Sequence, residues 1–169
     1  DTLTQSVEAM REQIERHLAR TRSAASARFA ASCDVALSLE RLKRAMGTLY
    51  RDRQLRIESF FDGAPRFRGD SADFEEMAGN LTDNACKWAM STVRLYAHSN
   101  NGEVIVDVDD DGPGFTDPAS SGLGLSIVRE LAGLYGGRLE VDHAPDLKGG
   151  RARLILPGVT LALPLVAVL

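Results

Sequence analysis

Two amides and an ammonium recur at helical spacing between residues 76 and 88. Asn80, Asn84 and Lys87 are four and three residues apart, and Glu76 precedes them by four. A helix brings all four onto one face. Asparagine carbonyl oxygens suit a hydrated Mg²⁺ whose remaining ligands are phosphate oxygens, and a lysine beside them can contact the same phosphates as a point charge. A solvated polar helix face would show the same spacing.

The adjacent side of this helix is apolar, and its start carries a capping signal. The apolar stripe comprises Phe74, Met77, Ala78, Leu81, Ala85 and Trp88. Such a stripe is typical of a helix that packs on a sheet. Asp73 is followed three residues later by Glu76, which predicts Asp73 as the N-cap residue and gives Glu76 a structural role.

An acidic glycine turn follows further along the chain. The segment 104–108 alternates as a strand and runs into Asp109-Asp-Asp111-Gly112-Pro-Gly114. Glycines at 112 and 114 let the backbone approach a flat ligand, and a carboxylate at 111 can accept a hydrogen bond from an exocyclic amine. An acidic hairpin is the alternative. A calcium loop is disfavoured because the full ligand spacing and the terminal glutamate are missing.

A second glycine segment, Gly122-Leu123-Gly124-Leu125, opens another predicted helix, which a glycine pair at 136–137 closes. Its apolar positions recur at helical spacing: Leu125, Val128, Leu131, Ala132 and Tyr135. Backbone amides at such a helix start can bind an anion. The segment is not a dinucleotide-binding fingerprint, because it has too few glycines and no strand leads directly into it.

These three elements, in this order, resemble the N box, the D-x-G-x-G box and the G-x-G-x box of the GHKL ATPase superfamily. The form of the first, from Asn80 to Trp88, is most similar to bacterial sensor histidine kinases of the PhoQ-like branch. The resemblance covers about residues 55–157. It implies an α/β protein with a Bergerat-type ATP-binding fold, a two-layer sandwich with a mixed sheet and helices on one face.

The resemblance also implies that ATP and Mg²⁺ are cofactors, and it assigns a role to individual residues. Asn84 would be the magnesium ligand with Asn80 beside it, and Lys87 would contact the phosphates, so that Asn80 and Lys87 act in catalysis. Asp111 would bind the adenine amine, and Trp88 would lie near the nucleotide. The site would be shaped by Gly112, Gly114, Gly122, Leu123, Gly124 and Leu125.

The position of Asn80 bears on the reaction. Hydrolases of the superfamily carry a glutamate there to activate water, and an amide cannot act as a general base. The resemblance therefore implies transfer of the ATP γ-phosphoryl group to a histidine on a hairpin helix absent from this chain. Glu76 leaves open a GHKL ATPase with a shifted base. Only residues 116–121 separate the two glycine segments, where the family has a long lid, which leaves open a non-catalytic dimerisation or partner-binding module with a vestigial site.

Residues 1–30 have the heptad pattern of a coiled coil. The seam comprises Leu3, Val7, Met10, Ile14, His17, Thr21 and Ala24, with alternating spacings of four and three. The segment resembles the second helix of the kinase dimerisation hairpin and predicts a homodimer. His17 lies on this seam and no acidic residue follows it, so we interpret it as a bundle residue rather than the phosphoacceptor.

The remaining sequence predicts a catalytic domain over residues 31–158 and an apolar tail over 159–169. Pro164 interrupts the tail, which is too short to cross a bilayer. The resemblance implies a cytoplasmic location, a cognate response regulator as partner, and a membrane part upstream of Asp1. A net charge of −4 and a pI of about 5.4 disfavour nucleic-acid binding. Two distant cysteines do not form a disulfide framework.

Overall fold

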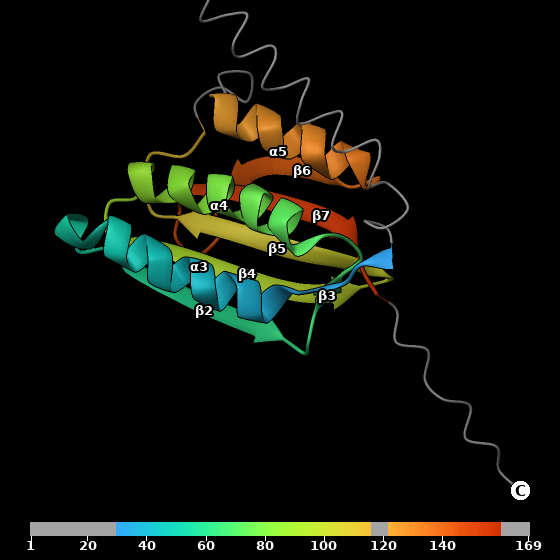
Figure 1. The fold of residues 1–169 in the computed structure, drawn as a ribbon. Coiled ribbons are helices and arrows are strands. Elements are labelled where there is room, and N and C mark those ends of the chain that lie inside the picture. The colour runs from blue at the N-terminus through green and yellow to red at the C-terminus, as the bar shows by residue number, and fades with distance from the viewer. Residues whose placement is uncertain (1–29, 116–121, 160–169) are drawn as a thin grey trace, which may run out of the picture.

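The computed structural model describes residues 30–115 and 122–159, which form a two-layer structure (Figure 1). The main sheet contains β2 (Arg56–Asp62), β4 (Thr92–Asn100), β5 (Glu103–Asp110), β6 (Arg138–His143) and β7 (Gly150–Pro157). The strand order is β2-β4-β5-β7-β6. Strands β2 and β4 are parallel and the other neighbours are antiparallel, so the sheet is mixed.

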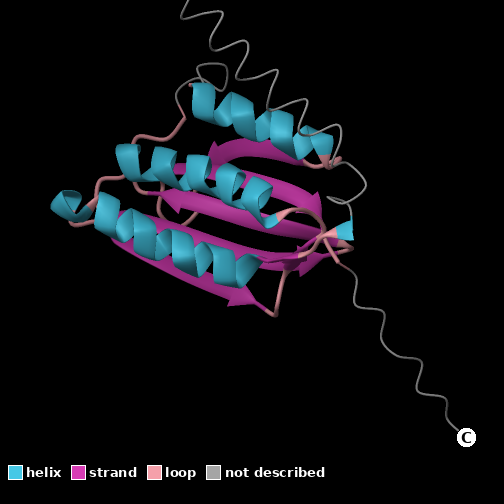
Figure 2. Cartoon of the chain, in the orientation of Figure 1, coloured by secondary structure: helices cyan, strands magenta, loops and turns pink. Residues whose placement is uncertain are grey.

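Among the described residues, three helices cover one face of this sheet (Figure 2). They are α3 (Val35–Leu49), α4 (Ser71–Trp88) and α5 (Leu123–Leu134). A small sheet of β1 (Cys33–Asp34) and β3 (Arg66–Phe67) lies beside them. The predicted two-layer α/β sandwich is therefore confirmed. The predicted coiled-coil segment and nearly all of the apolar tail lie outside the described residues, so the domain boundaries remain predictions.

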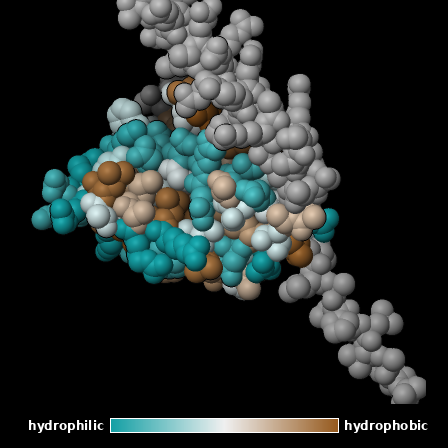
Figure 3. All heavy atoms as spheres, viewed as in Figure 1, coloured by the Kyte–Doolittle hydropathy of each residue, from teal (hydrophilic) through white to brown (hydrophobic). Residues whose placement is uncertain are grey.

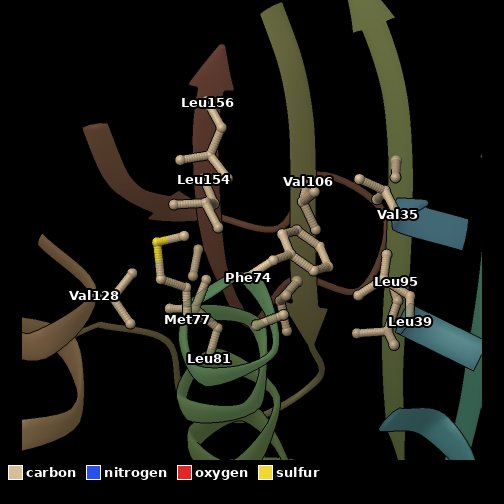
Figure 4. Close-up of a cluster of buried hydrophobic side chains, with 14 of the residues drawn as sticks. Val35, Leu39, Phe74, Met77, Leu81, Leu95, Val106, Val128, Leu154 and Leu156 are labelled. Atoms are coloured by element: carbon tan, nitrogen blue, oxygen red, sulfur yellow. The ribbon is translucent and has the colours of Figure 1, made fainter. Parts of the chain in front are cut away.

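The core lies between the helices and the sheet, and alternating strand residues meet helical stripes there (Figure 4). Val106 and Leu154 project from the sheet, and Phe74 and Met77 project from α4 toward them. All four side chains are fully buried. The stripe predicted on α4 thus fixes which face of that helix meets the sheet, and the polar face is left for other contacts.

The start of α4 differs from the prediction. Asp70, not Asp73, is the N-cap residue, because its carboxylate accepts hydrogen bonds from the amides of Ala72 (2.8 Å) and Asp73 (3.2 Å). Asp73 is buried and accepts a hydrogen bond from the hydroxyl of Tyr135. Aspartate is a favoured N-cap residue at either position, and the burial of Asp73 against the end of α5 decides between them.

The surface of the helical layer is mostly hydrophilic, with separate hydrophobic patches (Figure 3). Within the described part of the chain, none of the helices combines the length and apolar character that a membrane span requires.

The sheet face opposite the helices carries a ladder of charged pairs. Asp107 and Asp109 are nearly inaccessible, although no described helix covers this face. Arg153 donates two hydrogen bonds to Asp107 (2.7 and 2.8 Å), and Arg151 does the same for Asp109 (2.7 Å each). Each pair joins directly opposite positions of β5 and β7. Cross-strand pairing with the arginines covers both carboxylates.

We expect Asp107→Ala to lower the free energy of unfolding by about 1–3 kcal/mol, because it removes two charge-assisted hydrogen bonds and leaves Arg153 without its acceptor. Urea denaturation measures this change. Asp146→Ala is the control: it removes the same charge and also breaks an arginine contact, but its side chain is 78% exposed. Its cost should stay below about 1 kcal/mol. Equal losses in the two variants would contradict the structural importance of the ladder.

Candidate nucleotide-binding site

The polar face of α4 meets the start of α5 at Asn80. The Asn80 amide nitrogen donates to the carbonyl oxygen of Glu76 (2.8 Å). Its Oδ1 lies beside Gly124, where an added Cβ would approach within 3.2 Å. A side chain at position 124 would therefore press on Asn80. The structure thus brings the first and third sequence elements together, although more than forty residues separate them in the chain.

Asn84 lies one turn further along α4 and is half-buried. Among the described residues, none forms a hydrogen bond with its side chain. No group of three or more His, Cys, Asp or Glu in residues 30–115 and 122–159 could hold a metal ion. The amide oxygens of Asn80 and Asn84 are neutral donors on this face, a pair that fits Mg²⁺ only when phosphate oxygens and water complete the coordination.

Lys87 is already engaged by an acidic neighbour. Its ammonium lies 2.8 Å from Asp83, and its side chain is 61% exposed. Asp83 also accepts a hydrogen bond from the hydroxyl of Tyr50 (2.6 Å). Burial raises the pKa of Asp83, but the hydrogen bonds from Lys87 and Tyr50 outweigh it and the pKa is lowered. Burial and Asp83 together raise the pKa of Tyr50 to about 12.

The acidic turn places Asp110 and Asp111 in different environments, and Asp110 is the buried one. Its Oδ1 accepts hydrogen bonds from the amides of Gly112 (2.8 Å) and Gly150 (3.3 Å). Burial raises the pKa of this carboxyl, while the two amides oppose the shift. No described residue donates to its Oδ2. Asp110 therefore keeps one acceptor oxygen for a ligand.

Asp111, predicted to bind the adenine amine, is instead saturated by the chain around it. Its carboxylate accepts hydrogen bonds from the amides of Met90 (2.8 Å), Ser91 (2.9 Å) and Thr92 (3.0 Å), and from the Ser91 hydroxyl (2.6 Å). Burial alone would raise its pKa, but these donors lower the pKa to about 2. Both oxygens are engaged, so the geometry favours Asp110 over Asp111 for binding an amine.

Gly112 and Gly114 serve different purposes in this turn. A Cβ on Gly112 would lie 2.3 Å from the Trp88 carbonyl oxygen, so the end of α4 and the turn touch through backbone. Gly114 has φ +81° and lies beside His143. Only glycine adopts that conformation without strain. The predicted glycines are thus explained here by chain contacts and conformation.

Sequence reasoning missed Gly149 and Gly150, which close the turn from the β7 side. A Cβ on Gly149 would lie 2.1 Å from the Asp110 carbonyl oxygen. A Cβ on Gly150 would lie 3.1 Å from Asp110 Oδ2 and 3.0 Å from the Phe115 ring. A glycine pair at the start of a strand can mark close backbone approach, and the pair at 149–150 is present in the sequence.

The other predicted residues lie at the ends of α4 and α5. Trp88 ends α4 and is 62% exposed, so it lies outside the core despite its place in the apolar stripe. Gly122 is the N-cap residue of α5 and makes no side-chain cap. Leu123 is 69% exposed, whereas Leu125 is buried in the core. Leu125 therefore positions the helix and does not present its side chain to a ligand.

The family described as histidine kinase-, DNA gyrase B- and HSP90-like ATPase matches residues 69–165. The sensor protein kinase CarS of Pseudomonas aeruginosa is 34% identical over 171 residues, covering 92% of this chain and 38% of CarS. The sensor protein PhoQ of Escherichia coli K12 is 28% identical over 137 residues, covering 72% of this chain and 28% of PhoQ. The chain thus spans well under half of these relatives.

Solved structures show the same fold. The ATP-binding domain of PrrB from Mycobacterium tuberculosis superposes with a TM-score of 0.68 at 27% identity, covering 77% of this chain and 98% of that domain. Full-length ShkA in complex with AMPPNP gives a TM-score of 0.68 at 26% identity, covering 80% of this chain and 32% of ShkA. The resemblance to sensor histidine kinases is confirmed. The family match spans more than half of the chain, and the protein therefore belongs to the histidine kinase-, DNA gyrase B- and HSP90-like ATPase family.

Proposed function

We propose that this chain is the ATP-binding catalytic domain of a two-component sensor histidine kinase. It would transfer the γ-phosphoryl group of ATP to a histidine on a helix of the kinase dimerisation hairpin. The observation that carries the proposal is Asn80, which lies against Gly124 at the start of α5, at the position where hydrolases of the family carry a glutamate. An amide there can orient a ligand but cannot take a proton from water.

Each part of the site has a task in this reaction. Asp110 accepts from the adenine amine through Oδ2, and Gly112 keeps the acidic turn against the end of α4. Asn84, with Asn80 beside it, would hold Mg²⁺, which would supply positive charge to neutralise the phosphates. Lys87 adds a positive charge to them after leaving Asp83, which keeps its hydrogen bond from Tyr50. Phosphoryl transfer depends mainly on such positioning and charge stabilisation.

Transfer to a supplied hairpin tests the proposal. The chain, γ-labelled ATP and Mg²⁺ are mixed with a hairpin carrying an acceptor histidine followed by an acidic residue and a proline. We expect acid-labile label on the hairpin and none on His17, so that His17→Ala changes nothing. Free phosphate without labelled hairpin, reduced by Glu76→Gln, would instead establish an ATPase with a shifted base. Bound nucleotide with neither product would establish a non-catalytic module.

The metal role of Asn84 has its own test. Asn84→Ala should weaken ATP binding about tenfold in Mg²⁺ and much less in EDTA, because it removes an ion ligand rather than a base contact. Calorimetry in the two buffers measures the difference. The variant should remain folded, since Asn84 is not part of the buried core. Equal losses with and without the ion would show that Asn84 acts on the nucleotide directly.

The larger assembly is also a proposal. The relatives are named as sensor proteins, which supports a cognate response regulator as the partner, a homodimer formed through residues 1–30, and a cytoplasmic location beneath a membrane-bound receptor. No nucleic acid is proposed as a partner, because the net charge is −4.

A further inference from the structure

The last turn of α4 is held by a cation from another element. Arg53 ends the short 3-10 helix η1 (Arg51–Arg53). Its guanidinium donates to the carbonyls of Cys86 (3.1 Å), Lys87 (3.3 Å) and Ala89 (2.6 Å). The final carbonyls of a helix have no partner within it, and a cation is favoured at this end of the helix dipole. Arg53 therefore caps α4 without a glycine.

The residues after α4 are held from the opposite side by an anion. Asp111 accepts hydrogen bonds from the amides of Met90 and Ser91, which lead into β4, and of Thr92, the first residue of that strand. The segment from Cys86 to Thr92 is thus fixed through its carbonyls by Arg53 and through its amides by Asp111. Both sets of hydrogen bonds are charge-assisted and resist displacement more strongly than neutral ones.

This segment reaches the adenine-binding carboxylate through backbone contact. The Trp88 carbonyl oxygen lies so close to Gly112 that a Cβ there would be 2.3 Å away. The amide of Gly112 in turn donates to Oδ1 of Asp110 at 2.8 Å. Close-packed backbone transmits small shifts because it has no space to absorb them. A displaced end of α4 would therefore move Gly112 and alter the orientation of Asp110.

We propose that Arg53 is a positioning residue for adenine recognition. By holding the carbonyls at the end of α4, it keeps Trp88 against Gly112 and Asp110 in the orientation that accepts the adenine amine. Arg53 contacts neither base nor phosphate in this arrangement, and its effect is on selectivity. The inference rests on the proposed function, since it concerns how the same site distinguishes adenine from other bases.

The test compares Arg53→Met with Arg51→Met. Both remove one arginine from η1, but of these two arginines only Arg53 donates side-chain hydrogen bonds to the end of α4 in the described part of the chain. Dissociation constants for ADP and GDP are measured by calorimetry on the 169-residue chain. Emission of Trp88, the only tryptophan in the sequence, reports on the end of α4.

Arg53→Met should weaken the binding of ADP roughly tenfold and that of GDP little. It should also change Trp88 emission in the absence of nucleotide. Arg51→Met should match the wild type. If Arg53→Met does not fold, Arg53→Lys makes the same comparison, because one ammonium cannot span three carbonyls. An unchanged ratio of ADP to GDP affinity in a folded Arg53 variant would overturn the inference. Failure of the wild type to bind ADP would instead refute the proposed function.

Discussion

Asp110→Asn should weaken ADP binding by about 10- to 100-fold and remove most of the preference for adenine over guanine. The substitution keeps the shape of the side chain but replaces a charged acceptor, and hydrogen bonds to charged groups contribute about 1.5–3 kcal/mol. An amide at 110 can also present its NH₂ to the guanine carbonyl, which a carboxylate repels. Calorimetry with ADP and GDP measures both effects.

Asp111→Asn is the matched control, because the same chemical change is made one residue away. It should reduce stability, since it weakens the hydrogen bonds from residues 90–92, but it should preserve most of the preference for adenine. The opposite pattern, with selectivity lost at 111 and kept at 110, would restore Asp111 as the adenine-binding residue.

The two carboxyls should also differ in their pH dependence. Burial raises the pKa of Asp110. The pKa of Asp111 is lowered to about 2, because the hydrogen bonds from residues 90–92 outweigh the effect of burial. As the pH falls, Asp110 takes up a proton first and loses its charged acceptor while Asp111 remains ionised. ADP affinity should therefore decline as the pH falls through the raised pKa of Asp110, well above pH 2.

Gly112→Ala should abolish ADP binding at concentrations that saturate the wild type. The new Cβ would lie 2.3 Å from the Trp88 carbonyl oxygen and 2.9 Å from Asp110 Oδ1, so the turn and the end of α4 must separate. Such overpacking lowers the free energy of unfolding by about 1–3 kcal/mol. Calorimetry gives the loss of binding, and thermal unfolding shows what fraction of the variant is folded.

Gly133→Ala provides the control for this substitution. Gly133 lies within α5, and in the described part of the chain no atom outside its own helix turn lies within 4 Å of its added Cβ. Alanine is favoured over glycine in a helix by about 1 kcal/mol, so this variant should be slightly more stable and bind ADP normally. Normal ADP binding by Gly112→Ala would contradict the close approach between the turn and α4.

The fold was largely predictable because its signals are local. Helical periodicity identified α4 and α5, and alternation identified β5, since each pattern depends only on which face is buried. The polar face of α4 followed from the same reasoning. The contact between Asn80 and Gly124 required knowledge of the family, because no local pattern brings α4 beside the start of α5.

The acidic turn shows where the sequence-based assignment and the geometry favour different residues, and which signal was available. Each of the three consecutive aspartates carries a carboxylate that could accept a hydrogen bond from the adenine amine. The alternation of β5, however, buries Val104, Val106 and Val108 toward the helices. Continued by two residues, it places Asp110 on the same side and Asp111 on the other. The alternation of β5 therefore identifies Asp110 as the buried carboxylate, whereas proximity to Gly112 would have pointed to Asp111.

Titration of the 169-residue chain with ATP and GTP in the presence of Mg²⁺ tests the central claim most directly. The account predicts one bound ATP per chain and GTP binding at least about tenfold weaker, because Asp110 offers an acceptor to the adenine amine and repels the guanine carbonyl. Absence of heat with ATP at millimolar concentration, or equal affinity for the two nucleotides, would contradict an adenine site formed by α4, the acidic turn and the start of α5.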